Sequence, residues 1–182
     1  MREWTSLYKE NSMKYLKKLL LTGAAVLMCS MANAQLAKAP PEVTAAMLVK
    51  VAVFEMNLSD GRDISIYVMG APEVAAELRK GIGKDVGKSK LQRVESGVNL
   101  PESRPSILYV GSASRIEEAL EYTRSNKILS VTGDPNLMDR GITLGFGIGD
   151  DSKPKIVLNP QSAAQEGLEW NPAIFKIAKT VK

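Results

Sequence analysis

The side chains that could perform chemistry in this chain are carboxylates, lysines, serines and tyrosines, because histidine is absent and Cys29 is the single cysteine. A Ser-His-Asp triad, a Cys-His pair and a His-ligated zinc are therefore excluded, and one cysteine cannot hold an iron–sulfur cluster. No acid–base pair with a raised pKa is indicated by the remaining residues. The sequence predicts a protein with no enzymatic activity, metal or cofactor.

The strongest candidate for ligand binding is Thr132-Gly133-Asp134, which ends an apolar run that is typical of a buried strand. In parallel α/β sheets, ligands bind at the carboxyl ends of the strands. Gly70 and Gly111-Ser112 end two other predicted strands and would line the same crevice. We therefore expect a small-molecule crevice at these residues. Capping of the following helix by Asp134, with Pro135 at the first helical position, is the simpler explanation for that carboxylate.

Two further motifs fit structural roles better than chemical ones. Gly145-Phe146-Gly147-Ile148-Gly149 is spaced like a nucleotide-binding loop, but it lies within a predicted hairpin and opens no helix. Close packing or strand bending explains these glycines better. The adjacent Asp150 and Asp151 fit a solvated turn better than a cation site.

A lysine-rich stretch and one tryptophan are candidates for contact with a partner. Lys84, Lys88 and Lys90 lie in a segment with several glycines. Lysines protecting a solvated sheet edge are the favoured interpretation, and a docking patch for an anion or a partner is the alternative. Trp170 precedes Asn171-Pro172. It either contacts a partner or, more commonly for an aromatic there, packs as a hydrophobic staple against the next helix.

The elements that must position these residues alternate between strands and helices. Apolar runs and turn residues predict strands over 64–69, 90–95, 105–111, 127–132, 142–148 and 155–158. Apolar periodicity predicts helices over 43–58, 72–80, 114–125, 160–166 and 172–181, with Ser114 and Glu117 as a capping box for the third. This pattern predicts an α/β fold with three layers. Its sheet is mostly parallel, Rossmann-like or flavodoxin-like, flanked by helices, and ends in a C-terminal β-hairpin.

The N-terminus has the pattern of an export signal. Three lysines between residues 14 and 18 precede an apolar run over 19–28, and Ala32-Asn33-Ala34 supplies the small residues that a signal peptidase recognises. The sequence predicts a signal peptide over 1–34 with cleavage after Ala34, and hence a periplasmic location. Residues 1–12 are polar, and Met13 opens a better signal, which suggests a mis-assigned start.

The chain that remains after cleavage is nearly neutral. Residues 1–34 hold five basic and two acidic side chains, which leaves nineteen basic and eighteen acidic ones. This balance gives no indication of nucleic-acid binding. We expect a short tether over 35–42 and a single domain over 43–182, which is a length that one hydrophobic core can stabilise.

In order and spacing, these segments resemble the YfiR-like family of exported bacterial regulators. The resemblance covers nearly the whole chain after residue 42. Its matching segments are Leu48–Phe54 with Asn57-Leu58, Ile66–Gly70, Ile107–Gly111, Ile128–Asp134, Gly141–Phe146, Ile156–Asn159 and Gly167-Leu168. The most specific part is the strand Leu129-Ser130-Val131-Thr132-Gly133-Asp134, followed by the strand that contains Phe146 and by Ile156-Val157-Leu158-Asn159.

The resemblance implies a periplasmic, non-enzymatic regulator that acts by protein contact, often as a dimer. Its partner would be an inner-membrane signalling protein, such as a diguanylate cyclase or a sensor kinase, which it would repress in a cyclic di-GMP pathway. The alternative from the residues themselves stays open: a periplasmic carrier or sensor that binds a small ligand in the crevice at the strand ends.

Overall fold

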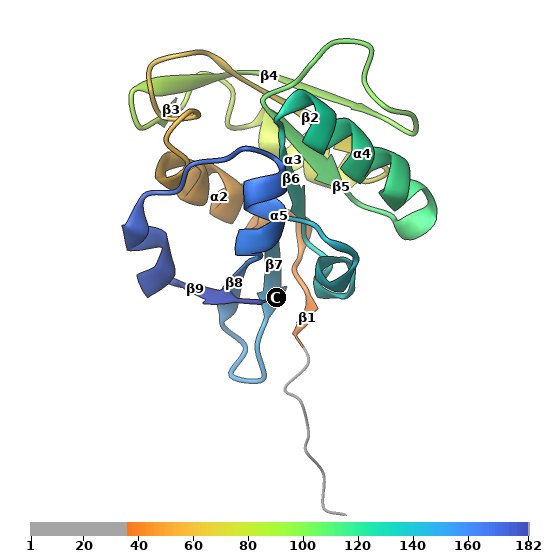
Figure 1. The fold of residues 1–182 in the computed structure, drawn as a ribbon, viewed down its shortest axis with the longest axis vertical. Helices are drawn as coiled ribbons and strands as arrows, with labels where there is room; N and C mark the ends of the chain where they lie inside the picture. The colour runs from red at the N-terminus through yellow and green to blue at the C-terminus, as the bar shows by residue number, and fades with distance from the viewer. Residues whose placement is uncertain (1–35, 182) are drawn as a thin grey trace, which may run out of the picture. The chain divides into compact units, whose positions relative to one another are not determined.

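The computed structural model describes residues 36–181, so the predicted signal peptide lies outside the described part. Figure 1 shows the fold. The strands are β1 (Ala37–Lys38), β2 (Ile64–Met69), β3 (Asp85–Val86), β4 (Ser89–Gly97), β5 (Ile107–Val110), β6 (Leu129–Thr132), β7 (Leu144–Ile148), β8 (Pro154–Leu158) and β9 (Ala178–Thr180). The α-helices are α2 (Pro41–Val51), α3 (Pro72–Arg79), α4 (Ile116–Asn126) and α5 (Pro160–Gln165). The 3-10 helices are η1 (Ala52–Phe54), η2 (Ala113–Arg115), η3 (Pro135–Arg140) and η4 (Pro172–Lys176).

The described strands form one mixed sheet in the order β3-β4-β2-β5-β6-β7-β8-β9, and β1 pairs with β7. From β4 through β2, β5 and β6 to β7, all neighbours are parallel. Strand β8 is antiparallel to β7 and parallel to β9. The predicted α/β fold with a mostly parallel sheet and a C-terminal hairpin, formed by β7 and β8, is confirmed.

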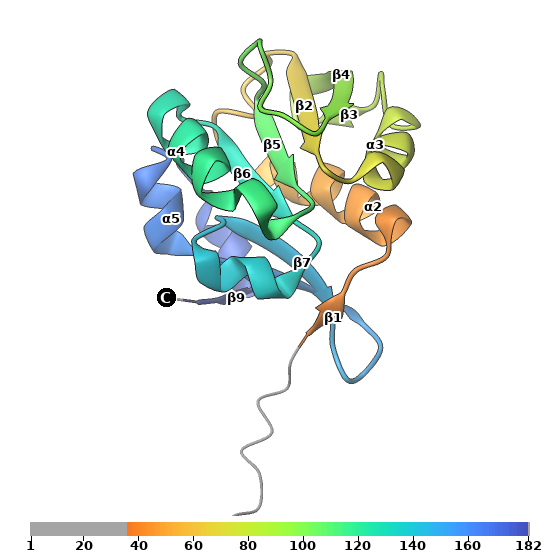
Figure 2. The same ribbon diagram turned by 90° about the vertical axis from the view of Figure 1, so that its right-hand side faces the viewer.

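Helices cover both faces of this sheet, as Figure 2 shows for α2 and α3 on one side and α4 on the other. Side chains alternate along β5, so Ile107 and Tyr109 pack with α2 and α3 in one core cluster. Leu108 and Val110 pack with α4 and η3 in a second cluster. This alternation gives the three layers, because consecutive strand residues point to opposite faces.

The first helix is shorter than predicted. A single helix over 43–58 is wrong: α2 begins at Pro41, ends at Val51 and continues as the 3-10 helix η1. Glu55 then adopts an extended conformation and pairs with Trp170, and Met56 N donates to Glu169 O at 2.8 Å. Backbone pairing with a distant segment therefore ends the helix, which helical periodicity cannot reveal.

Both ends of the domain add strands that the sequence did not predict. The tether over 35–42 instead contains β1, which pairs with β7, and the first residues of α2. The predicted helix over 172–181 is wrong, because only the short η4 forms and Ala178–Thr180 becomes β9 beside β8. The edge of β8 pairs with the backbone N–H and C=O groups of residues 178–180. These sheet hydrogen bonds outweigh the weak preference of residues 178–180 for a helix.

The start of α4 also differs from the prediction. Ser114 and Glu117 form no capping box, because Ser112 Oγ accepts from Ser114 N and caps η2, and α4 begins only at Ile116. None of the helices in the described part is long and apolar enough to span a bilayer.

Candidate functional site

The residues of the predicted crevice do lie together at the carboxyl ends of β2, β5 and β6. Thr132 Oγ1 donates to Val110 O at 2.9 Å and accepts from Asp134 N. Gly133 N donates to the Tyr109 hydroxyl at 3.0 Å, and Gly133 O accepts from Ala39 N. The polar groups of this edge are thus bonded to neighbouring strands and to the segment that leads into α2.

Close packing leaves little space at these strand ends. A Cβ added at Gly133 would lie 2.7 Å from the Tyr109 hydroxyl and 2.8 Å from Thr44 Oγ1. A Cβ at Gly111 would lie 2.5 Å from the Cβ of Ala71. Burial raises the pKa of Tyr109 to about 12, so its hydroxyl stays protonated. Ligand binding at this edge therefore stays a prediction, and the observed role of its glycines is packing.

Capping explains the polar side chains that flank these glycines. Asp134 Oδ1 accepts from Asn136 N at 3.0 Å at the start of η3, as predicted. Gly70, with a φ of +72°, turns the chain from β2 toward α3, and its N–H donates to Gly97 O.

The glycines of β7 are also explained by packing. A Cβ at Gly145 would lie 2.3 Å from Met138 Sδ, and one at Gly147 would lie 2.8 Å from Pro135 Cγ. At the hairpin tip, Asp151 pairs with Lys155 at 2.8 Å. Within residues 36–181, no group of three or more acidic, cysteine or histidine side chains is arranged to hold a metal ion.

The predicted lysine patch lies on the small hairpin of β3 and β4. Lys84, Lys88 and Lys90 are all exposed, and Lys90 Nζ is 3.9 Å from Asp85 Oδ1 across the hairpin. Gly87 makes the turn with a φ of +64°. Because β3 pairs only along two residues of β4, the rest of β4 forms an open edge of the sheet, and lysines there oppose edge-to-edge association.

Trp170 does not lie on the β3–β4 hairpin with these lysines. It lies in the segment before η4, where its backbone pairs with that of Glu55. Its half-buried ring packs against the core cluster that contains Ile174, and both the staple and the partner contact stay predictions. The indole N–H is buried and has no hydrogen-bond partner in the described part of the chain. The segment 55–59 connects the two predicted partner regions, since Lys88 N donates to Ser59 O at 3.3 Å.

Four large apolar side chains of the two segments that pair at Glu55 and Trp170 are exposed to solvent. They belong to η1, η4 and the residues that follow them, and their exposed fractions lie between 36% and 53%: Val53, Met56, Phe175 and Ile177. The two segments are tied together, because Asn171 N donates to Phe54 O at 2.7 Å. We call Trp170 and these four residues the apolar face. Neighbouring exposed apolar side chains of this kind are typical of protein contact sites.

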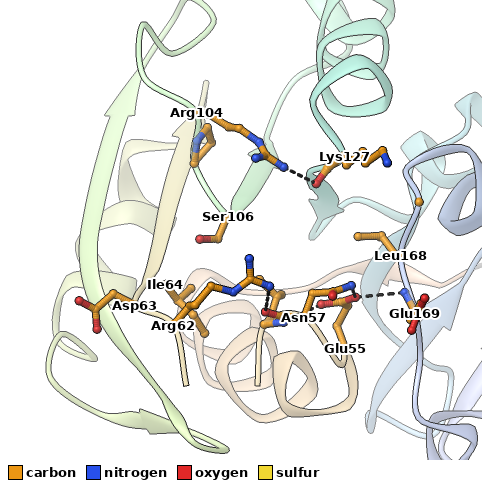
Figure 3. A pocket seen from close by; sticks show the side chains of 13 residues that line it. Glu55, Asn57, Arg62, Asp63, Ile64, Arg104, Ser106, Lys127, Leu168 and Glu169 are labelled. Carbon is orange, nitrogen blue, oxygen red and sulfur yellow. Dashed lines mark hydrogen bonds between the residues drawn. The ribbon is translucent and has the colours of Figure 1, made fainter. Parts of the chain in front are cut away.

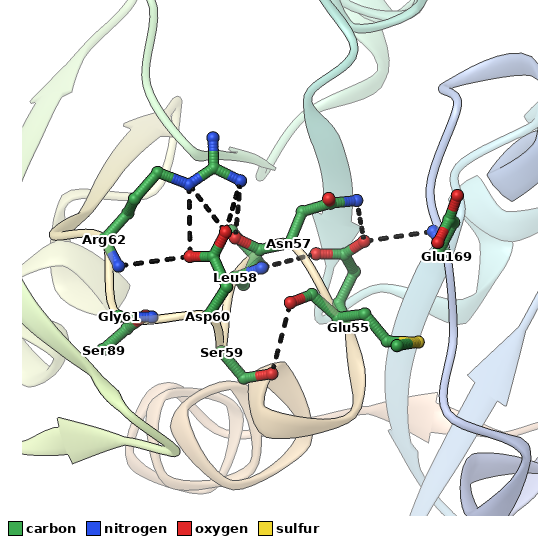
Figure 4. A network of polar contacts seen from close by, with 10 residues as sticks. Glu55, Asn57, Leu58, Ser59, Asp60, Gly61, Arg62, Ser89 and Glu169 are labelled. Atoms are coloured by element: carbon green, nitrogen blue, oxygen red, sulfur yellow. Dashed lines mark hydrogen bonds and ion pairs between the residues drawn. The ribbon is translucent and has the colours of Figure 1, made fainter.

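A buried carboxylate that the sequence analysis missed organises the segment beside this face. Figure 4 shows Glu55, whose Oε1 accepts from Asn57 Nδ2 and Glu169 N, each at 3.1 Å, and whose Oε2 accepts from Leu58 N at 2.7 Å. The exposed Arg62 donates to Asp60, and this hydrogen bond lowers the pKa of Asp60. A glutamate in an otherwise apolar segment was the signal that could have indicated the network.

A polar pocket lies beside the same segment, at the amino ends of the parallel strands. Figure 3 shows it, and its volume is about 410 Å³. Arg62, Arg104 and Lys127 line it together with Glu55 and Glu169. Arg104 Nη2 donates to Lys127 O at 3.3 Å, and neither cation forms an ion pair within the described residues. The sequence analysis looked at the opposite edge of the sheet and missed this pocket.

Comparison with known proteins identifies the kind of domain. A family model described as YfiR/HmsC-like matches residues 41–179. A crystal structure of a conserved domain protein from Vibrio cholerae matches with a TM-score of 0.53 and 14% sequence identity, over 79% of this chain. The match spans 60% of that protein's chain, and at this identity it supports the fold alone. No curated protein sequence matches.

Proposed function

Because the chain belongs to the YfiR/HmsC-like family, we propose that it is a periplasmic regulator that binds an inner-membrane signalling protein and holds it inactive. The partner would be a diguanylate cyclase or a sensor kinase, and the output would be cyclic di-GMP or phosphotransfer. The predicted export signal supports the location, and the resemblance of the sequence to exported regulators supports the role.

The observation that carries this proposal is the apolar face. Its five side chains combine a half-buried tryptophan with four aliphatic or aromatic side chains that are each at least a third exposed. Interfaces are enriched in aromatic residues and methionine at their centres, and a few such residues supply most of the binding energy. We therefore place the contact with the periplasmic part of the membrane receptor on this face.

Repression by binding is a shift between two receptor conformations. The regulator must bind the inactive conformation more tightly, and a hundredfold preference corresponds to about 2.8 kcal/mol. Two well-packed contacts of the kind that Trp170 and Phe175 could make are sufficient, because single interface side chains often contribute about 1–2 kcal/mol or more. A face of this size can thus account for regulation without catalysis.

The proposal is tested by crosslinking from a defined position in cells. A photo-crosslinking amino acid replaces Met56 on the apolar face, and a control places it at the exposed Glu121 on α4. We expect position 56, and not position 121, to capture a membrane protein with a cyclase or kinase domain. Capture from both positions or from neither would contradict a specific contact at this face.

Loss of regulation is the second readout. Phe175→Asp places a charge on the apolar face without touching the core, and Glu121→Gln is the matched surface control. In a deletion strain, we expect Glu121→Gln to restore the normal signalling output and Phe175→Asp to leave it derepressed. Full restoration by Phe175→Asp, at equal protein level, would argue against the proposed contact.

The polar pocket of Figure 3 favours a second candidate function, the binding of a small polar ligand. Arg104 and Lys127, which form no ion pair within residues 36–181, line it together with Glu169, so both signs of charge are available to a ligand. A thermal-melt screen of metabolites tests this function, since a ligand at a hundred times its dissociation constant stabilises the fold by about 2.7 kcal/mol. Stabilisation that disappears in Arg104→Ala would support the carrier or sensor; no stabilisation by any metabolite would count against it.

A further inference from the structure

Basic residues are concentrated in one segment of this domain. Residues 79–93 hold six basic side chains and one acidic side chain, although residues 35–182 as a whole are nearly balanced. The segment comprises the end of α3, the following turn and the β3–β4 hairpin. Protection of the open β4 edge explains Lys90 and Arg93, which lie on that strand. It does not explain the lysines that lie outside β4.

Three lysines surround a hollow between α2 and α3. The hollow has a volume of about 350 Å³, and Lys50, Lys80 and Lys84 lie around it. Alanine, valine and leucine side chains form its apolar part: Ala45, Ala46, Val49 and Leu78. Two acidic residues also line it, Glu42 and Glu77, and Glu77 is already paired with Lys80 at 2.7 Å. Lys50 and Lys84 form no ion pair within the described residues, so the rim keeps a positive excess.

The turn beside this hollow exposes an isoleucine. Ile82 is 47% exposed and lies between Lys80 and Lys84, on a turn in which Gly83 has a φ of +86°. Ile82 is thus an exposed apolar side chain that lies between two cations of the same turn. At a lipid headgroup layer, such a turn would place its lysines at the phosphates and its single aliphatic side chain toward the apolar boundary.

We propose that this basic surface, defined as Lys50, Lys80, Ile82, Lys84 and Lys88, docks on a bilayer that contains anionic phospholipids. The lysines bind lipid phosphates, and Ile82 enters the interface between headgroups and acyl chains. The lysines complement the negative charge of anionic lipid headgroups. An acidic protein is the less favoured occupant, because protein contacts usually centre on aromatic side chains and this surface has a single aliphatic one. The inference goes beyond the proposed function, since the lipid contact needs no receptor and uses a different surface.

Vesicle binding tests the inference directly. The protein, purified from the exported fraction of cells, is floated with phosphatidylcholine vesicles that either contain or lack phosphatidylglycerol. We expect binding only to the anionic vesicles and a steep loss of binding as the salt concentration rises. Failure of the wild-type protein to bind anionic vesicles at low salt would overturn the inference and leave the receptor proposal untouched.

Matched variants locate the contact. The triple variant Lys50→Gln, Lys84→Gln and Lys88→Gln removes three positive charges from the basic surface, and should weaken binding on the order of 100-fold, at about tenfold or less per lysine. The control has the same net charge but changes lysines elsewhere on the surface: Lys38→Gln, Lys153→Gln and Lys179→Gln. We expect the control to bind nearly as the wild type does. Equal losses in both variants would show non-specific charge attraction and contradict a defined surface.

Ile82→Ser separates insertion from simple charge attraction. It keeps every charge and lies on an exposed turn, so the fold is retained, and we expect roughly three- to tenfold weaker vesicle binding. Unchanged binding by Ile82→Ser would remove the isoleucine from the proposed surface. Binding to cell membranes that is lost after protease treatment, together with no binding to anionic vesicles, would instead identify an acidic protein as the occupant and refute the lipid contact.

Discussion

The stabilities of Glu166→Gln and Glu166→Ala should show whether the buried carboxyl group of Glu166 is neutral or ionised in the folded protein. Glu166 Oε1 lies 2.7 Å from Thr123 Oγ1, and Oε2 accepts from Thr143 Oγ1 at 2.7 Å and Ser130 N at 3.1 Å. Burial raises the pKa of Glu166, and the hydrogen bonds from these partners oppose the shift. The side chain thus joins α4, β6 and the residue before β7.

Thr123 gives the reason to expect the neutral form. Its hydroxyl has one proton and is 3.1 Å from Leu120 O as well as close to Glu166. If the carboxyl group is protonated, it donates to Thr123 Oγ1, and Thr123 donates to Leu120 O, so all of these groups are satisfied. Glu166→Gln reproduces this pattern, because the amide N–H₂ donates to Thr123 and the amide oxygen accepts from Thr143 and Ser130.

The two substitutions should therefore have opposite effects on stability. Glu166→Ala leaves Ser130 N and the Thr143 hydroxyl buried without this acceptor, at about 1–3 kcal/mol each, and opens a cavity. We expect a loss of about 3 kcal/mol or more, which corresponds to a decrease in Tm of about 10 °C in a domain of this size. Glu166→Gln should be as stable as the wild type at neutral pH, or more stable.

The raised pKa of Glu166 also predicts how the stability of the wild-type fold changes with pH. A carboxyl group with a raised pKa in the folded state costs nothing below its ordinary pKa, where both states are protonated. It destabilises the fold progressively as the pH rises above that value toward the folded pKa. Melting curves between about pH 4 and 8 should thus show the Tm advantage of Glu166→Gln growing with pH. A Glu166→Gln protein as unstable as Glu166→Ala at every pH would refute the reasoning and indicate that the charge itself is required.

Three other substitutions test the remaining networks. Glu55→Ala removes the acceptor of three hydrogen bonds and should cost about 2–4 kcal/mol in chemical unfolding, with weaker crosslinking at the adjacent apolar face; unchanged stability would contradict its structural role. Gly111→Ala forces a Cβ to within 2.5 Å of the Ala71 Cβ, so we expect a loss of about 1–3 kcal/mol, and a neutral result would show that the strand ends are loosely packed. Asp134→Ala should cost about 1 kcal/mol and Asp134→Asn almost nothing, because asparagine also caps helices; equal losses in both would point to a role for the charge.

The strands were predictable because short apolar runs with turn residues at both ends allow few alternatives. Ile107–Val110 and Leu129–Thr132 are buried on both faces, as parallel strands between two layers of helices must be. The failures occurred at segments whose structure depends on a distant partner. Ala178–Thr180 is a strand only because β8 has a free edge, and η1 ends where the backbone at Glu55 meets Trp170. Local sequence contains neither partner.

The candidate site was harder to predict, and the reason lies in the topology. Parallel sheets usually bind ligands at the carboxyl ends of their strands, which led to Gly133 and its neighbours. In this protein, Ala39 N donates to Gly133 O and Thr44 of α2 packs over the same glycine, so the segment that enters the domain covers that edge. The pocket formed instead at the amino ends, where Arg104 and Lys127 come from loops that have no periodic pattern.

The covered edge has a consequence for function. The N-terminal segment packs on Gly133 at the carboxyl ends of the strands, and the outer surfaces of the domain remain available for recognition. The segment 55–59 contains Met56 of the apolar face, and its Ser59 O accepts from the backbone N–H of Lys88 of the basic surface. Glu55 fixes this segment through three hydrogen bonds. This connection would hold the proposed receptor contact and the proposed lipid contact in one fixed relation. If both proposals hold, an approach to the bilayer through the basic surface would also orient the apolar face toward the receptor.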